Sequence, residues 1–204
     1  MKAEASSESV SRETLDRLEL YQALLSKWNT RINLVAPSTI EDSWNRHFRD
    51  SLQIFLEAGE EPAHWCDLGS GAGFPGMVAA IAAHGAGWTT KFTLIESDQR
   101  KCTFLRTVSR ETGVPVTILP ERIEAAAPQD ADLVSARALA PLPRLLPWIR
   151  RHISGNGRAI LPKGRTYQQE LDEVRDNYAF SLEIRPSEVD SGSVILKLES
   201  IRDV

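Results

Sequence analysis

Beyond residue 63 the chain alternates short apolar runs with longer stretches of helical periodicity, and this alternation restricts the possible folds more than any other feature. Apolar runs of four or five residues are typical of buried strands, and intervening helical stretches are typical of βαβ units. We predict strands at 64–68, 92–96, 116–119, 132–136 and 158–161, with helices that begin near Pro75, Asp98, Pro141 and Thr166. Such units build an α/β fold, a mostly parallel sheet with helices on both faces.

The segments on either side of this alternating region have a different character. The runs at 180–184 and 194–198 flank a turn-rich stretch, so we predict an antiparallel pair that completes a seven-stranded sheet. Before residue 62, one apolar stripe predicts a helix over 15–28, and a second helix should begin at the capping-box pattern Ser38-Thr39-Ile40-Glu41. Neither helix buries its stripe alone. We therefore expect an N-terminal helical extension, residues 1–62, packed on a single globular unit, residues 63–204.

Composition narrows the class of protein. Apolar residues make up 42% and charged residues 25% of the 204 residues, as in an ordinary globular domain. No apolar run approaches the ~18 residues of a membrane span, and residues 1–13 lack a secretory signal, so we expect a cytoplasmic protein. The cysteines and histidines show no metal-ligand spacing, so we expect no metal and no disulfide; they are Cys66, Cys102, His47, His64, His84 and His152.

The charge distribution is compatible with a specific anionic partner but does not require one. A net charge of −4 argues against indiscriminate coating of nucleic acid. Yet residues 133–169 contain no acidic side chain, and a second basic run occupies 99–110. A local basic face would bind a polyanion where shape also matches, whereas scattered solvated arginines explain the run equally well. The first run contains Arg137, Arg144, Arg150, Arg151, Arg158, Lys163 and Arg165.

The sharpest local motif is the turn Asp67-Leu68-Gly69-Ser70-Gly71-Ala72-Gly73-Phe74-Pro75-Gly76, which follows the first strand and opens a helix. Its alternate glycines allow backbone to approach a ligand closely, where a Cβ atom would collide. The Asp67 carboxylate can accept hydrogen bonds from the loop or from a ligand ammonium. Glu96 ends the second strand about 25 residues later, where a carboxylate can hold two ribose hydroxyls.

Three interpretations of this turn remain open. Gly71, Gly73 and Gly76 satisfy the G-x-G-x-x-G pattern of dinucleotide sites. Counted from Gly69, however, Phe74 stands where that pattern needs its third glycine, and Pro75 removes an amide that a pyrophosphate would use. The turn therefore favours S-adenosylmethionine, which has no phosphate, over a dinucleotide. A purely structural turn is the third interpretation.

Six sequence blocks resemble, in order, those of one known family. They are the glycine-rich turn with Leu94-Ile95-Glu96-Ser97 and the basic helix 100–105, and then Trp28-Asn29-Thr30-Arg31-Ile32-Asn33-Leu34, His47-Phe48-Arg49-Asp50-Ser51-Leu52, Glu121-Arg122-Ile123-Glu124, Ser135-Ala136-Arg137-Ala138 and Leu161-Pro162-Lys163-Gly164. Over residues 20–170 the chain thus resembles the RsmG (glucose-inhibited-division protein B) family, methyltransferases of bacterial small-subunit ribosomal RNA.

The resemblance implies a class I (Rossmann-like) methyltransferase. It implies methyl transfer from S-adenosylmethionine to N7 of one guanine in the decoding-region loop of 16S rRNA, which leaves 7-methylguanosine and S-adenosylhomocysteine. The expected partner is 16S rRNA or the small ribosomal subunit, and we expect a monomer. The alternatives are a small-molecule or other RNA methyltransferase of the same fold, an NAD-binding oxidoreductase and a cofactor-binding regulator without catalysis.

The family blocks also assign roles to residues. Gly69 and Phe74 would contact the methyl donor in the turn, Glu96 its ribose, Ile123 and Glu124 its adenine, and Arg137 its methionine end or the target base. With the neighbouring positions, the expected cofactor residues are Asp67, Gly69, Ser70, Gly71, Gly73, Phe74, Glu96, Ser97, Ile123, Glu124 and Arg137. The expected RNA contacts are Arg100, Lys101, Lys163, Arg165 and His47.

The expected chemistry needs few catalytic groups. Guanine N7 carries a lone pair and no proton, so attack on the sulfonium methyl needs no general base, and orientation supplies the catalysis. Arg137 is the one expected catalytic residue: it either donates to guanine O6 or pairs with a carboxylate. His47 and Asp50, one turn apart, either pin their helix over the cofactor pocket or form an inconsequential helix-face pair.

Overall fold

The computed structural model describes residues 10–204; residues 1–9, part of the expected extension, lie outside the described residues. Seven strands form one sheet in the order β3-β2-β1-β4-β5-β7-β6. Strands β1 to β5 pair in parallel, and β7 pairs antiparallel with β5 and β6, which confirms the predicted arrangement. The strands are β1 (His64–Leu68), β2 (Lys91–Ile95), β3 (Thr117–Leu119), β4 (Ala131–Ser135), β5 (Ile153–Lys163), β6 (Tyr178–Pro186) and β7 (Val194–Asp203).

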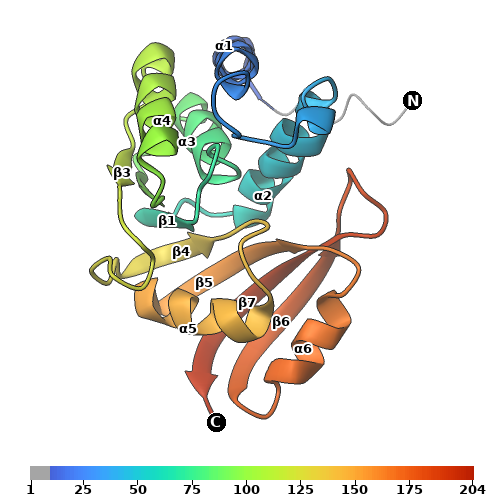
Figure 1. The fold of residues 1–204 in the computed structure, drawn as a ribbon. Helices are drawn as coiled ribbons and strands as arrows, with labels where there is room; N and C mark the ends of the chain where they lie inside the picture. The colour runs from blue at the N-terminus through green and yellow to red at the C-terminus, as the bar shows by residue number, and fades with distance from the viewer. Residues whose placement is uncertain (1–9) are drawn as a thin grey trace.

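Helices cover both faces of the sheet, as Figure 1 shows. One face carries α1 (Arg12–Asn29), α2 (Asp50–Ala58), α3 (Gly76–Gly85) and α4 (Gln99–Thr112); the other carries α5 (Leu142–His152) and α6 (Tyr167–Val174). Side chains of the central strands alternate between the two layers, so that Trp65 packs in the first core and Cys66 in the second. Burial on both faces explains why these strands are continuous apolar runs in the sequence.

Strand β5 begins at Ile153 rather than at residue 158. Its first part contains Gly155 and Gly157, and the register against β4 shifts between Ala131 and Leu133. Glycine inside a strand weakens the apolar pattern and often accompanies a bulge. The sequence pattern therefore did not predict this first half of β5.

The N-terminal helices pack on the first face of the sheet. Leu18, Tyr21 and Leu25 of the α1 stripe are fully buried, and α1 contacts α3 and α4 while α2 contacts α3 and β5. The predicted start of the second helix at Ser38 is wrong. Residues Pro37–Thr39 form a short 3₁₀ turn, and the helix begins at Trp44 with a π-helical segment, η2 (Trp44–Arg49), that continues into α2.

Local bonding explains this difference. The Thr39 hydroxyl donates to Ala36 O at 2.7 Å and lies 3.0 Å from His47 Nε2, so it closes the short 3₁₀ turn and joins it to η2. A further turn, closed by Ser43 N to Ile40 O at 3.1 Å, separates the 3₁₀ turn from Trp44. The division of the chain near residue 62 stays a prediction.

Three further observations bear on the sequence-based expectations. Cys66 and Cys102 are free and buried. Across residues 10–204, no group of three or more acidic, cysteine or histidine side chains is arranged to hold a metal ion. In the same range, no helix combines the length and the apolar character needed to cross a bilayer.

Candidate active site

A cavity of about 460 Å³ opens at the carboxyl ends of β1, β2, β3 and β4. This edge is where open α/β sheets bind ligands. We name it the cofactor cavity, and its lining includes every expected cofactor residue except Asp67 and Gly73: Gly69, Ser70, Gly71, Phe74, Glu96, Ser97, Ile123, Glu124 and Arg137. The structure thus brings together segments that lie far apart in the sequence.

The three alternate glycines of the turn, Gly69, Gly71 and Gly73, are needed for different reasons. A Cβ atom at Gly71 (φ +58°) would have no neighbour nearer than Gly69 O at 3.9 Å, so only here does the bare backbone face open space. A Cβ at Gly69 (φ +64°) would lie 2.6 Å from Leu139 Cδ1. At Gly73 it would collide with the Tyr21 hydroxyl and lie 2.9 Å from Met77 Cβ, which cannot rotate away. The expectation that a ligand requires the glycines therefore fits Gly71, whereas packing requires the other two.

Substitution should separate these reasons. We expect Gly71→Ala to lower the free energy of unfolding by about 1 kcal/mol, the cost of a left-handed backbone. Gly73→Ala should lower it by about 3 kcal/mol, because the added methyl also overpacks the space beside Met77 and Leu105. Urea denaturation of both variants measures the difference, and equal losses would contradict this explanation.

Glu96 is fixed between the turn and the start of α4. Its Oε2 accepts from Gly71 N at 2.8 Å, and its Oε1 accepts from Asp98 N at 2.7 Å. The side chain is 8% exposed and lines the cofactor cavity. A carboxylate oxygen accepts more than one hydrogen bond, so both oxygens keep capacity for the hydroxyls of a ligand.

Asp67 lies beneath the turn, outside the lining of the cavity. Its Oδ1 accepts from Ser135 Oγ at 2.6 Å, and Ser135 Oγ in turn accepts from Trp65 Nε1 at 2.9 Å. Within residues 10–204, Oδ2 is buried and has no hydrogen-bond partner. Burial raises the pKa of this carboxyl to about 6. In this structure Asp67 links β1 to β4, and its predicted contact with the methyl donor stays a prediction.

This burial should make stability depend on pH. Because the pKa of Asp67 is higher in the folded chain than its ordinary 3.8, the favourable contribution is complete below that value and is lost as pH rises through about 6. We expect the unfolding free energy of the wild type, measured relative to Asp67→Asn, to fall by about 2 kcal/mol between about pH 4 and pH 8. Parallel urea titrations of the two proteins across this range check it, and a constant difference would refute it.

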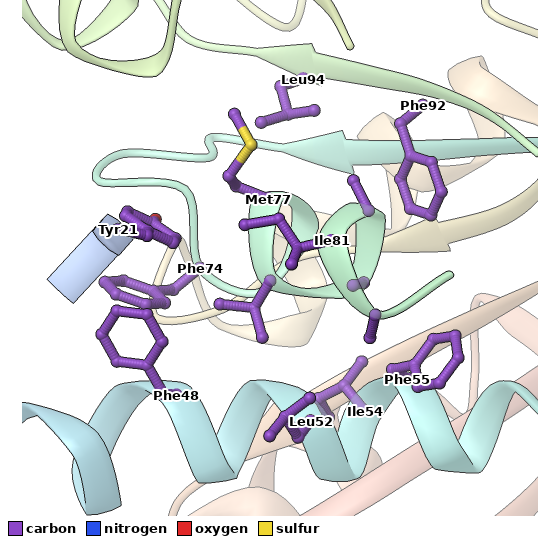
Figure 2. Packing of buried hydrophobic residues seen from close by; sticks show 14 of the residues in the cluster. Tyr21, Phe48, Leu52, Ile54, Phe55, Phe74, Met77, Ile81, Phe92 and Leu94 are labelled. Carbon is purple, nitrogen blue, oxygen red and sulfur yellow. The ribbon is translucent and has the colours of Figure 1, made fainter. Parts of the chain in front are cut away.

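Aromatic side chains from the N-terminal extension support the turn (Figure 2). The buried Tyr21 hydroxyl donates to Ala72 O, and the Tyr21 ring stacks on Phe74 at 5.6 Å. Phe48 meets Phe74 edge-on at 5.2 Å, and His47 stacks on the same ring at 5.0 Å. The extension therefore forms part of the wall behind the cofactor cavity.

Arg137 follows β4 and is held by the same extension. Its Nη1 donates to Asp50 Oδ2 at 3.0 Å and to Arg46 O at 3.2 Å, and its Nη2 lies 3.1 Å from His47 Nδ1. The guanidinium also stands 5.0 Å over the Phe74 ring. Burial, and then Arg137, lower the pKa of His47 to about 4, so its imidazole is neutral and accepts at Nδ1. Of the two expectations for Arg137, the pairing with a carboxylate is observed.

A second cavity, of about 500 Å³, lies on the other side of Arg137. Arg137, Ala138 and Leu139 line both cavities, and the second, which we name the acceptor cavity, is also lined by Asp50, Lys163 and Glu170. Lys163 Nζ donates to Ala140 O and to Glu170 Oε2, both at 2.8 Å, and its side chain is 9% exposed. Its expected contact with RNA phosphate stays a prediction.

The other expected RNA contacts are spread over the same edge. Lys101 lines the cofactor cavity, Arg100 is exposed beside Asp98, Arg165 is exposed near Gly192, and His47 is half-buried against Phe74. The basic run at 137–165 does not form one face. Arg150 pairs with Asp203, Arg151 donates to Ala126 O, and Arg158 donates to the carbonyl oxygen of Ala58, the last residue of α2.

Several residues of the site were not predicted from the sequence. Leu34, Val35, Arg144 and Trp148 also line the cofactor cavity. The first two belong to the Trp28–Leu34 block and the residue after it, so the block itself was a usable signal. Tyr21 had no such signal, because its position fits the apolar stripe of α1 and its partner is a backbone oxygen.

Comparison with known proteins agrees with this geometry. A family model described as GidB, rRNA small subunit methyltransferase G, matches residues 14–193. A protein named ribosomal RNA small subunit methyltransferase G from Ruegeria sp. (strain TM1040) is 46% identical over 195 residues, 96% of this chain and 95% of the relative. A protein of the same name from Rhodospirillum centenum is 50% identical over 192 residues, which cover 94% of this chain and 87% of the relative.

Solved structures show the fold. The 16S rRNA methylase RmtB matches with a TM-score of 0.57 and 15% identity, over 93% of this chain and 75% of its own. M. jannaschii TYW2, in complex with AdoMet, matches with a TM-score of 0.61 and 13% identity, over 86% and 80%. These likenesses confirm the predicted class I methyltransferase fold. The family match and the relatives confirm the resemblance found in the six sequence blocks: the chain belongs to the GidB family, rRNA small subunit methyltransferase G.

Proposed function

We propose that this protein transfers the methyl group of S-adenosylmethionine to N7 of a guanine in the decoding-region loop of 16S rRNA. The observation that carries the proposal is the cofactor cavity of this chain, which belongs to the GidB family. The cavity has a volume of about 460 Å³, lies at the carboxyl edge of the sheet and is bounded by the glycine-rich turn and Glu96. The substrate would be the rRNA itself or the small subunit, and the enzyme would act in the cytoplasm as a monomer.

The residues present suit this cofactor. The Glu96 carboxylate, beside Ser97, would accept from the two ribose hydroxyls, and buried Ile123 offers an apolar wall to the adenine beside Glu124. Gly71 leaves room for the methionine part at the turn. When bound, S-adenosylmethionine supplies an electrophilic methyl group on a sulfonium. Pro75, which lacks an amide hydrogen at the start of α3, argues against a pyrophosphate in the same place.

The acceptor cavity would admit the target guanine. Arg137 separates it from the cofactor cavity, so its guanidinium would donate to O6 while the adjacent N7 points toward the methyl donor. The Asp50 and Glu170 carboxylates would accept from N1–H and the N2 amine on the far edge of the base. The N7 lone pair would form the new C–N bond, and the electrons of the C–S bond would return to the sulfur of the donor. No proton leaves, so the chain needs no general base.

The test uses labelled S-adenosylmethionine and small subunits from a strain that lacks this enzyme. We expect label at a single guanine, as N7-methylguanosine, and none on subunits that already carry the modification. Calorimetry with S-adenosylmethionine and with NAD should show binding of the first alone. Methylation of a small molecule but not of RNA, or binding without turnover, would overturn the proposal.

A further inference from the structure

A third cavity, of about 260 Å³, lies where the end of α1 meets the start of α4. None of the cofactor roles proposed above uses it. We name it the α1–α4 cavity, and it is lined by Lys27, Trp28, Arg31, Ile32, Arg100 and Thr103. Helices α1 and α4 stand side by side on the same face of the sheet (Figure 1).

Its walls combine an anchored aromatic ring with cations. Trp28 is half-buried, and its ring packs at 5.7 Å against the fully buried Phe104, so the ring is a fixed platform. Lys27 and Arg31 are exposed, and within residues 10–204 neither side chain has a hydrogen bond or ion pair. Arg100 has a side chain that is 72% exposed, and its Nη2 lies 3.3 Å from Asp98 Oδ2. An aromatic platform beside free cations is typical of sites for single-stranded nucleic acid.

The cavity also adjoins the active site. Ile32 lines it, and Leu34 and Val35, two and three residues later, line the cofactor cavity. On α4 the consecutive residues Arg100 and Lys101 line one cavity each. The α1–α4 cavity is therefore a neighbour of the cofactor cavity, within reach of a strand that enters the active site from the side of α1 and α4.

We propose that the α1–α4 cavity binds an unstacked nucleotide of the RNA strand that flanks the methylated guanine. The inference rests on the proposed function, because it takes RNA as the substrate. The base of that nucleotide lies against Trp28 and Ile32, and the phosphates on either side pair with Lys27, Arg31 and Arg100. An acidic peptide is the rival occupant, since it would use the same cations without needing the aromatic ring.

The charges are tested in the triple variant Lys27→Ala, Arg31→Ala and Arg100→Ala. We expect KM for small subunits to rise by ~10–100-fold, and the slope of log affinity against log salt to flatten by about 2–3, the effect of three lost phosphate contacts. The Kd for S-adenosylmethionine and kcat at saturating subunits should stay within about twofold. The matched control is Lys91→Ala, Arg175→Ala and Arg202→Ala, three exposed cations that remove the same charge away from this cavity and the active site.

The stacking is tested with Trp28→Leu and Trp28→Phe. We expect Trp28→Leu to raise KM by ~5–100-fold and Trp28→Phe to restore most of the affinity, because a phenyl ring still offers a face to a base. Thermal unfolding verifies that both variants are folded at the assay temperature. Equal KM values for the triple variant and its control would overturn the inference. Equal KM values for Trp28→Leu and Trp28→Phe would also overturn it, because a peptide site would not need the aromatic ring. Failure of the wild type to methylate subunits would instead refute the proposed function.

Discussion

Replacement of Arg137 by alanine should lower kcat/KM for methyl transfer by ~100-fold or more, the cost of a small misplacement of reacting groups. Arg137 forms the partition between the cofactor and acceptor cavities, and four contacts fix its guanidinium: Asp50, the Arg46 carbonyl, His47 and the Phe74 ring. Single-turnover assays with small subunits measure the effect. Arg137→Ala also leaves half-buried Asp50 without its partner, which should lower the stability of the variant. The assay temperature should therefore stay well below the Tm of Arg137→Ala.

Two further variants sharpen this prediction. Arg137→Lys should not restore activity, since one ammonium cannot reproduce the planar donor arrangement that reaches Asp50, Arg46 O and His47 together. Arg150→Ala is the control, because this arginine belongs to the same basic run yet pairs with Asp203 outside both cavities. An Arg137→Lys enzyme with wild-type kcat/KM would show that charge, not position, is what this residue supplies.

The strands were predictable because their burial leaves a direct mark on the sequence. Strand β1 matches its expected bounds, since apolar Trp65, Cys66 and Leu68 face cores on both sides of the sheet. The edge pair β6 and β7 was found from its turn-rich connection. Where glycines interrupt the pattern, as in the first half of β5, the same reasoning failed.

Contacts between distant segments were much less predictable. The sequence indicated that Arg137 pairs with either a base or a carboxylate, but Asp50 lies 87 positions away, and only the packing of η2 and α2 against the sheet selects it. The basic run shows the same limit in reverse. Arg150, Arg151 and Arg158 are close together in the sequence. In the folded chain, helix α5 and strand β5 place their side chains against separate partners.

In the glycine-rich turn, the sequence indicated the correct positions for glycine but only part of the reason for them. Glycine at 69 and 73 was expected to make room for a ligand. The structure shows that Leu139 occupies the space beside Gly69, and that the Tyr21 hydroxyl and Met77 occupy the space beside Gly73. A sequence pattern records that a Cβ atom is not tolerated, but it does not record what the Cβ would meet.

Replacement of Glu96 should affect the cofactor more than any other change in the cavity. We expect Glu96→Ala to weaken S-adenosylmethionine binding by ~100-fold or more, because it removes charged hydrogen bonds to the ribose, each of ~1.5–3 kcal/mol, and also the bonds that hold the Gly71 and Asp98 amides. Glu96→Gln should lose less, about tenfold, since one amide oxygen still accepts. The salt dependence of binding should stay small, because the cofactor carries no phosphate to pair with the rim cations.

Isothermal titration with S-adenosylmethionine and S-adenosylhomocysteine measures these losses. Glu121→Gln is the matched control: Glu121 lines the same cavity but is exposed, so its neutralisation should change Kd by less than about threefold. Both ligands share the ribose, so Glu96 variants should weaken them by the same factor. A loss confined to S-adenosylmethionine would place Glu96 at the sulfonium and not at the ribose.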